Sequence, residues 1–245
     1  MRHAPTTRAV RRLLLLAGLV AAALAVGVAR ADASNECRGL QVCVPIQGPW
    51  VVVPTGRSVP RPEVQFQLSC PKGYIVGGTD AELTHSAIDL SFLGSLGAPV
   101  NPGVTTARDL VFVGSFVGGG SPTPSFRPHL GCMPAQGGGG RVPTSARAVV
   151  PPGKPSIRRV VNARLVALHT RRIAKGCAPN EHLVGAETAV GFDQAFPPSP
   201  LLAASVRVSE AVRGGRVVVV SAHAGSAVAG TKAIVQVEAI CAGGR

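Results

Sequence analysis

Cysteine usage constrains the fold of this sequence more than any other feature. The chain has six cysteines, namely Cys37, Cys43, Cys70, Cys132, Cys177 and Cys241. An even number of cysteines in an exported chain is typical of disulfide bonds. A metal site is not indicated, because the sequence has no C-x-x-C motif and no cluster of cysteine with histidine. We therefore expect three disulfides, although six cysteines allow fifteen different pairings.

An internal repeat indicates which cysteines pair. The segment Cys70–Asp80 aligns without gaps with Cys177–Glu187, and each is followed by a second cysteine at almost the same distance. Two matching spans predict one disulfide within each copy and leave the two N-terminal cysteines to close a small loop. The predicted pairs are Cys70 with Cys132, Cys177 with Cys241, and Cys37 with Cys43. Closing each long loop contributes about 4 kcal/mol through the unfolded state in the chain-entropy model.

The apolar residues favour short strands rather than long helices. They are largely β-branched, and 30 glycines and 21 prolines separate them into short runs. Alternation in Val64–Ser69 predicts a strand with one face in solvent. Further predicted strands are Trp50–Val53, Leu110–Val113, Leu165–Leu168, Arg216–Val220 and Ala233–Ile240. Residues Arg158–Leu168 could also form an amphipathic helix, but strands on either side favour a strand.

These patterns predict an all-β fold with two tandem, small, disulfide-stapled β-sandwich modules after a cleaved signal peptide. The predicted parts are a signal peptide at 1–31, a first β module at 32–133, a Gly/Pro-rich basic linker at 134–158 and a second β module at 159–245. The sequence does not indicate whether the two modules pack together, nor the oligomeric state.

The N-terminus has the pattern of a secretory signal peptide. Four arginines precede an apolar run, Leu13–Ala29, which ends in the small-residue pattern Ala29-Arg30-Ala31. A membrane anchor is the alternative, but the run is short for a bilayer that needs roughly 20 apolar residues. The pair Arg11-Arg12 leaves the export route open between the general and the twin-arginine pathways. We expect a protein that is secreted, extracellular or associated with the cell envelope, with no integral membrane span in the mature chain.

The opening motif of each copy carries a resemblance. Cys-Pro-x-Gly, a hydrophobic pair and Gly-Gly at Cys70–Gly78, with a closing strand such as Val237–Cys241, resemble repeat modules of secreted proteins from high-GC bacteria. The second copy, at Cys177–Gly185, lacks the Pro and Gly of the opening motif. The resemblance implies export and a β-rich fold, and it implies no chemistry.

Catalytic motifs are absent from the sequence. There is no G-x-S-x-G, H-E-x-x-H, P-loop, calcium-binding loop or dinucleotide fingerprint, so we expect a non-enzymatic protein without cofactor or metal. The alternative is a secreted hydrolase of unrecognised type, which could assemble a site from residues such as His85, His223 and Asp89. Asp80 and Glu187 occupy the same place in the two copies and could bind a cation or an amine, but a turn cap or a solvated strand end is favoured.

Positive charge is concentrated in the middle of the chain. The formal charge is +13, and loss of the five arginines in residues 1–31 would leave +8. From Leu110 to Asn180 there is no acidic residue, and fixed positive charge attracts polyanions. The residues predicted to bind a polyanion are Arg158, Arg159, Arg164, Arg171, Arg172 and Lys175. An anionic cell-wall polymer or polysaccharide is the expected partner, and nucleic acid is disfavoured because no stacking aromatics accompany the arginines. The alternatives are a solvated basic surface that only reflects an arginine-rich composition, and a purely structural envelope component.

Overall fold

A computed structural model describes residues 35–40, 42–56, 58–93, 108–119, 123–135 and 157–243. The contacts divide the chain into two units, Met1–Ala33 and Ser34–Arg245, and every described residue belongs to the second unit. The predicted signal peptide and residues 136–156 of the predicted linker lie outside the described residues. No helix within the described ranges is long and apolar enough to span a lipid bilayer.

The all-β fold class is confirmed, and its largest element is one sheet of seven strands, here called the central sheet. Its strands are β1 (Val44–Gln47), β2 (Trp50–Val52), β4 (Tyr74–Leu83), β7 (Ser125–Pro134), β8 (Ile157–Arg164), β10 (Glu181–Asp193) and β13 (Lys232–Gly243). Strand β7 pairs with β4 and also with β1 and β2, and β2 in turn pairs with β10. The short strand β2 therefore joins the two predicted modules through backbone hydrogen bonds.

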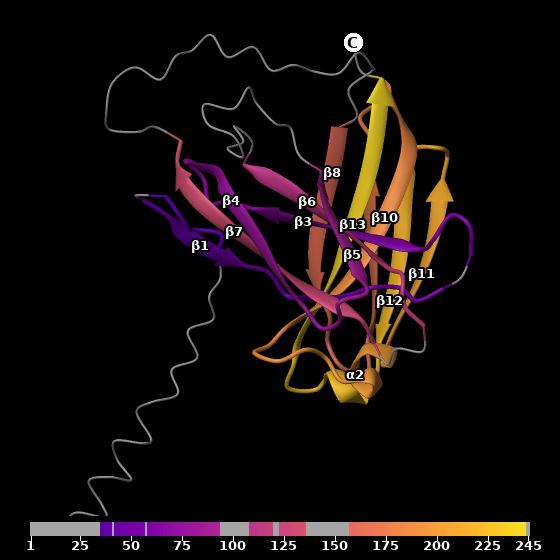
Figure 1. The fold of residues 1–245 in the computed structure, drawn as a ribbon. Coiled ribbons are helices and arrows are strands. Elements are labelled where there is room, and N and C mark those ends of the chain that lie inside the picture. The colour runs from indigo at the N-terminus through magenta and orange to yellow at the C-terminus, as the bar shows by residue number, and fades with distance from the viewer. Residues whose placement is uncertain are drawn as a thin grey trace, which may run out of the picture. The chain divides into compact units, whose positions relative to one another are not determined.

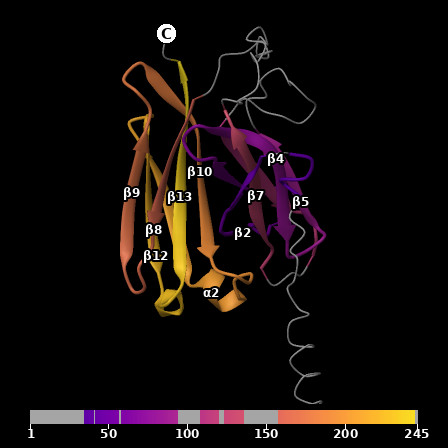
Figure 2. The same ribbon diagram turned by 90° about the vertical axis from the view of Figure 1, so that its left-hand side faces the viewer.

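Two smaller sheets pack against the central sheet. The first outer sheet has the order β3 (Glu63–Ser69), β6 (Asp109–Phe116), β5 (Ile88–Leu93), and the second has the order β11 (Val206–Arg213), β12 (Val217–Ala224), β9 (Thr170–Gly176). A short helix α2 (Pro200–Ala204) and a 3-10 turn η1 (Ser226–Val228) lie at one end of the second outer sheet (Figures 1 and 2).

The two outer sheets cover opposite faces of the central sheet. Ala189 of β10 belongs to the core under the first outer sheet, while its neighbour Val190 packs against the core under the second. In the same way Val51 faces the first core and Val52 the second. Because alternate residues of a strand point to opposite faces, the sheets form three layers with a hydrophobic core on each side of the middle one.

All three predicted disulfides are confirmed. The bonds are Cys37–Cys43, Cys70–Cys132 and Cys177–Cys241, and the two long ones enclose sequence separations of 62 and 64. The four cysteines of the long bonds are buried or half-buried beside the two cores.

Strands β4 and β10 pair with their partners in the same way. Val76 lies opposite Cys132, and the pairing is interrupted by a bulge before Gly78. Leu183 lies opposite Cys241, and the same interruption precedes Gly185. The bulge therefore falls seven positions after the first cysteine in both halves, at the place where the aligned sequences each carry a glycine next.

Several strand predictions need correction. Leu165–Leu168 is not a strand but the turn between β8 and β9, while residues 158–164 form a strand and not a helix. Gln65 was expected on a solvent face of β3, yet it is buried, because that face lies against β10 and β13. Strands also occupy both ends of the predicted linker 134–158, because β7 ends at Pro134 and β8 begins at Ile157.

Candidate functional site

The outer face of the second outer sheet is defined by the alternation of β12. Val218, Val220 and Ala222 are fully buried in the core, so Val217, Val219, Ser221 and His223 point to the other face. Residues directly opposite on antiparallel strands share a face. The partners of these outward residues are Thr170, Arg172, Ala174 and Gly176 on β9, and Arg207, Ser209, Ala211 and Arg213 on β11.

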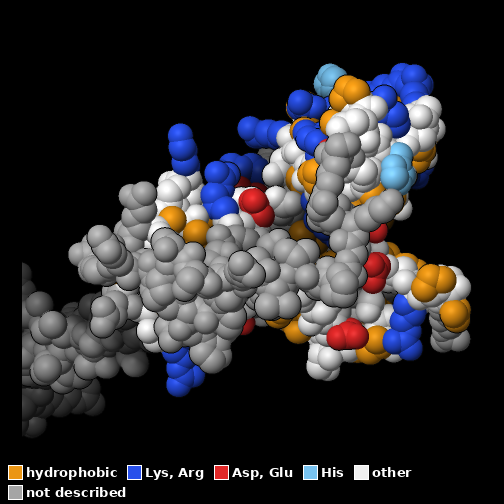
Figure 3. Space-filling model, turned by 90° about the horizontal axis from the view of Figure 1, so that it is seen from above, with side chains coloured by type: hydrophobic (Ala, Val, Ile, Leu, Met, Phe, Trp, Pro, Cys, Tyr) orange, Lys and Arg blue, Asp and Glu red, His pale blue; other side chains and the backbone are white. Residues whose placement is uncertain are grey.

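Three arginines therefore project from one flat sheet face. Arg172, Arg207 and Arg213 are all exposed, while Ala174, Ser209 and Ala211 supply small side chains between them. Strands β9, β11 and β12 with the β11–β12 turn contain six lysines and arginines and a single acid, Glu210, which lies on the other face opposite Val220. Figure 3 shows Lys and Arg side chains gathered on this side of the molecule, at the upper right.

Two of the predicted polyanion-binding residues already have acidic partners. Arg158 donates to Glu238 at 2.8 Å and to Gln65 at 2.8 Å. Arg159 donates through Nε and Nη2 to both oxygens of Glu181, at 2.8 to 3.1 Å. Arg159 is thus bound bidentately by a carboxylate, and Arg158 uses Nη1 for both of its bonds, so the charge of each guanidinium is already matched by an acid within the protein. The structure therefore gives these two arginines internal roles.

The other predicted residues remain available to solvent to different extents. Arg164 and Arg171 are exposed at the β8–β9 turn, where the Arg171 side chain donates to the carbonyl of Arg164 at 2.9 Å. Arg172 lies on the outer face described above, and Lys175 is half-buried near the end of β9. Arg207 and Arg213 were missed because they follow the acid-free stretch, and only the strand pairing places them beside Arg172.

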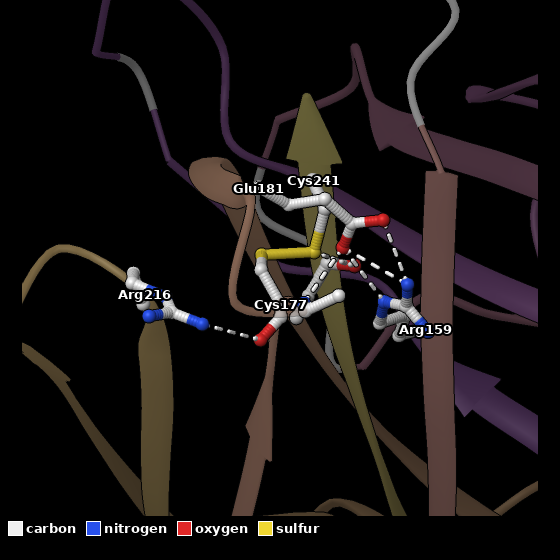
Figure 4. Close-up of a disulfide and its surroundings, with 7 residues drawn as sticks. Arg159, Cys177, Glu181, Arg216 and Cys241 are labelled. Atoms are coloured by element: carbon white, nitrogen blue, oxygen red, sulfur yellow. Dashed lines mark hydrogen bonds and ion pairs between the residues drawn. A yellow bond between two sulfur atoms is a disulfide. The ribbon is translucent and has the colours of Figure 1, made fainter. Parts of the chain in front are cut away.

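The Cys177–Cys241 disulfide lies beside an ion pair between Arg159, which is partly exposed, and Glu181 (Figure 4). Glu181 is buried, and its carboxylate accepts hydrogen bonds from Arg159 and from the backbone N–H of Ala178 at 2.8 Å. The hydrogen bonds from Arg159, aided by Ala178, lower the pKa of Glu181 below its ordinary value. Two sulfurs and a carboxylate lie close together here, but the sulfurs form a disulfide and so are not thiolate ligands. Arg216 also contacts Cys177 of this disulfide, since its side chain donates to the backbone carbonyl of Cys177 at 3.4 Å.

A network of carboxylates lies between the two halves of the molecule. Glu187 on β10 is directly opposite Glu238 on β13, and Gln65 of β3 donates to Glu187 at 3.4 Å and to Glu63 at 3.0 Å. Burial first, then the negative charges of Glu63, Glu238 and Glu210, raise the pKa of Glu187 to about 7, against the opposing effect of Arg158. Three of the other eleven acidic residues of this basic chain thus act on Glu187.

Asp80 and Glu187 differ in their surroundings despite their equivalent places in the sequence. Asp80 accepts hydrogen bonds from the backbone N–H groups of Asn35 and Ala81, so it holds the N-terminal segment. Glu187 lies in the carboxylate network. Both residues are inside strands, so the expectation of a turn cap or a solvated strand end was wrong for both.

Among the described residues, no hydrogen bond or ion pair links His85, His223 and Asp89, which were considered for a hydrolase site. Asp89 lies on β5 opposite Ser115. His85 lies in the β4–β5 connection beside Phe116, and His223 lies on β12 with Thr170 at 3.1 Å. A pocket of about 340 Å³ borders the first outer sheet, and the part of its lining that the structure describes contains no histidine and no carboxylate. Its lining residues are Gly56, Ser58, Val59, Arg61 and Phe116–Gly119. His169 and His182 are exposed.

Fold and site together define a disulfide-stabilised, all-β protein with a basic sheet face. No protein-family model, no curated protein and no solved structure matches the chain.

Proposed function

We propose that the protein is an exported, non-enzymatic binding protein whose ligand is an anionic polymer, such as a cell-wall polymer or an acidic polysaccharide. The observation that carries the proposal is the outer face of the second outer sheet, where Arg172, Arg207 and Arg213 project and where strands β9, β11 and β12 place no acidic residue. Cationic side chains on a flat surface attract polyanions and accelerate their encounter.

The arrangement of this face suits an extended ligand. Arg207 and Arg213 are six residues apart on β11, so their α-carbons are separated by roughly 20 Å along the strand. Arg172 lies two strands away, roughly 10 Å across the sheet. Small side chains between them, among them Ala174, Ser209 and Ala211, leave room for a chain-like ligand to lie flat.

Two further features support export and duplication. Three disulfides suit an oxidising compartment, and the basic and apolar N-terminal segment has the pattern of a signal peptide. We also infer that the two halves are copies of one repeat, because their disulfides, strand registers and bulges correspond.

The test is retention of Ser34–Arg245 on an immobilised polyanion in a salt gradient. The variant Arg172→Ser/Arg207→Ser/Arg213→Ser should elute at clearly lower salt, and its plot of log affinity against log salt should be less steep by about one for each lost contact. The matched control Arg38→Ser/Arg61→Ser/Arg108→Ser removes the same charge from exposed positions of the first half. Equal losses in the two variants would assign the retention to net charge alone and would overturn the proposal.

A further inference from the structure

One end of the second outer sheet exposes large apolar side chains. At the β8–β9 turn Val166 and Leu168 are 57 % and 70 % exposed. Phe196, in the connection from β10 to α2, is 70 % exposed, and Leu201, in α2 itself, is 75 % exposed. Hydrogen bonds place both segments at the same end. The backbone N–H of Leu168 donates to Ala224, and Gly225 donates to Ser205 at the end of α2. We call these four side chains the apolar tip.

Leu168 has both an unfavourable backbone conformation and an unfavourable, exposed side chain. Its φ of 63° lies in the left-handed region, which glycine and asparagine tolerate and leucine rarely adopts. Its side chain is also mostly in solvent, so it gains little from burial. A conformational outlier of this kind points to a role for the side chain outside the folded core.

Helix α2 holds its own apolar residue outward. Ser199 caps the helix by accepting from the backbone N–H of Leu202, and Leu202 is buried in the second core. Leu201 precedes this buried residue and therefore points away from the core at 75 % exposure. The anchoring of α2 by Leu202 keeps Leu201 and the neighbouring Phe196 at the surface without a partner among the described residues of the core.

Basic residues surround the apolar tip. Arg164 and Arg171 flank Val166 and Leu168, and Arg207 is the second residue of β11, which begins shortly after α2. The acid that the structure describes at this end is Asp193, which is neutralised by Lys232 at 3.5 Å. The end of the molecule therefore combines exposed apolar side chains with unbalanced positive charge.

We propose that the apolar tip docks the protein onto a lipid surface that contains anionic headgroups. Apolar side chains on loops enter the boundary between headgroups and acyl chains, and nearby lysines and arginines bind the anionic headgroups. The charge complementarity selects an anionic lipid surface over a neutral one. This role goes beyond polymer binding, because it depends on the exposed apolar side chains at the end of the sheet, which take no part in the outer face.

Flotation with lipid vesicles tests the proposal. Ser34–Arg245 is the unit to use, because it contains both cores and all three disulfides and omits the apolar run Leu13–Ala29, which would itself bind lipid. We expect the protein to float with vesicles of phosphatidylglycerol and phosphatidylcholine and to remain in solution with phosphatidylcholine alone. Absence of binding to the anionic vesicles would overturn the proposal, as would equal binding to both.

Matched variants separate the tip from other surfaces. Leu168→Asn/Phe196→Ser/Leu201→Ser should reduce binding to the anionic vesicles at least tenfold and should leave retention on the polyanion unchanged. The control Leu83→Ser/Phe92→Ser/Val117→Ser removes three exposed apolar side chains of the first half and should bind as the parent does.

The single variant Leu168→Asn relieves the backbone strain of a leucine in the left-handed region, so it should fold at least as well as the parent and still bind vesicles more weakly. Undiminished binding by this variant and by the triple variant would contradict the docking role.

Discussion

At the scale of single residues, Glu187 shows how a carboxyl group can be both internal and titratable. It lies directly opposite Glu238, and like charges in that position destabilise a strand pair. Glu238 is almost completely buried, and its Oε1 accepts no hydrogen bond from the described residues. Burial of Glu187, followed by the negative charges of Glu63 and Glu238, favours the protonated form and raises its pKa to about 7.

The raised pKa of Glu187 predicts a fall in stability with increasing pH. The unfolded chain releases this proton near the ordinary carboxyl pKa, whereas the folded protein keeps it until about pH 7, so the folded state binds more protons in between. The free energy of unfolding should therefore decrease from about pH 4.5 to above pH 7. Because the group is only about half buried and solvent screens it, we expect a loss on the order of 1 kcal/mol.

Urea unfolding of Glu187→Gln at several pH values checks this prediction. The variant should be more stable than the parent above pH 7 and should show a flatter pH dependence, because it cannot ionise. Asp89→Asn, which removes an exposed carboxylate from β5, serves as the control and should follow the parent curve. A Glu187→Gln curve that runs parallel to the parent curve would show that the network does not retain the proton.

At the scale of elements, the bulged strands explain why glycines occupy the repeat motif of the first half. Gly78 and Gly131 lie opposite each other, and the backbone carbonyl of Glu36 rests against both. A side chain at either glycine would occupy the position of that carbonyl. In the second half Gly185 lies opposite Ile240, whose side chain fills the corresponding space. The N-terminal loop thus accounts for a difference between the halves that an alignment alone does not explain.

Gly131→Ala should displace the N-terminal loop from the β4–β7 pair. The added methyl group would collide with the backbone of Glu36, which has no freedom to move away without releasing the loop closed by Cys37–Cys43. We expect a loss of about 1–3 kcal/mol in urea unfolding, as for other overpacked sites. Gly119→Ala, where the new methyl group meets nothing within 4 Å, should be nearly neutral. Equal stability of the two variants would show that the loop does not depend on this contact.

The side chain of Gln236 forms hydrogen bonds with the backbone of β3, the edge strand of the first outer sheet. Its buried side chain accepts from the backbone N–H of Gln67 at 2.6 Å and donates to the carbonyl of Gln67 at 2.9 Å. It thereby pairs the backbone of β3 in place of another strand, and unpaired strand edges otherwise invite association with other chains. A further bond to Asn162 at 2.8 Å fixes the amide orientation.

Loss of the hydrogen bonds between Gln236 and Gln67 should destabilise the protein, because it leaves buried polar groups without partners. Gln236→Ala deprives the N–H and the carbonyl of Gln67 of their bonds, so we expect the free energy of unfolding to fall by about 2–4 kcal/mol. Gln47→Ala, which loses one exposed bond of 3.3 Å to Glu82, should cost less than about 0.5 kcal/mol. Urea unfolding monitored by circular dichroism compares the two variants. A decrease for Gln236→Ala as small as that for Gln47→Ala would mean that water takes over the hydrogen bonds to Gln67.

The sequence allowed the disulfides and most strands to be predicted, because both depend on local patterns or on the repeat. It did not allow the roles of Arg158, Gln65 and Glu187 to be predicted. Their partners are 80 to 122 positions away, and they meet only because β3 lies against the face of β10 and β13. Alternation along β3 predicted that Gln65 leaves the first core, but it could not reveal that a second half of the molecule covers that side.

At the scale of the whole molecule, the shared central sheet predicts that the two halves unfold together. Strand β2 pairs with β7 of the first half and β10 of the second, and Gln236 and Arg158 add contacts to β3. Separate tandem modules would have given two independent transitions. Val218→Ala in the second core and Val64→Ala in the first each remove buried methyl groups, at a cost of about 2 kcal/mol. In a molecule of this size each should lower the melting temperature by about 4–8 °C.

Differential scanning calorimetry distinguishes the two possibilities. If the central sheet couples the halves, the parent shows one transition whose calorimetric and van't Hoff enthalpies agree, and each variant shifts the entire transition. If the halves are independent, there are two transitions, of which Val218→Ala shifts only one and Val64→Ala only the other.

Coupled unfolding has a consequence for binding as well. An anionic polymer on the second outer sheet would then raise the melting temperature of the first half too, because a ligand stabilises every element that unfolds with its site.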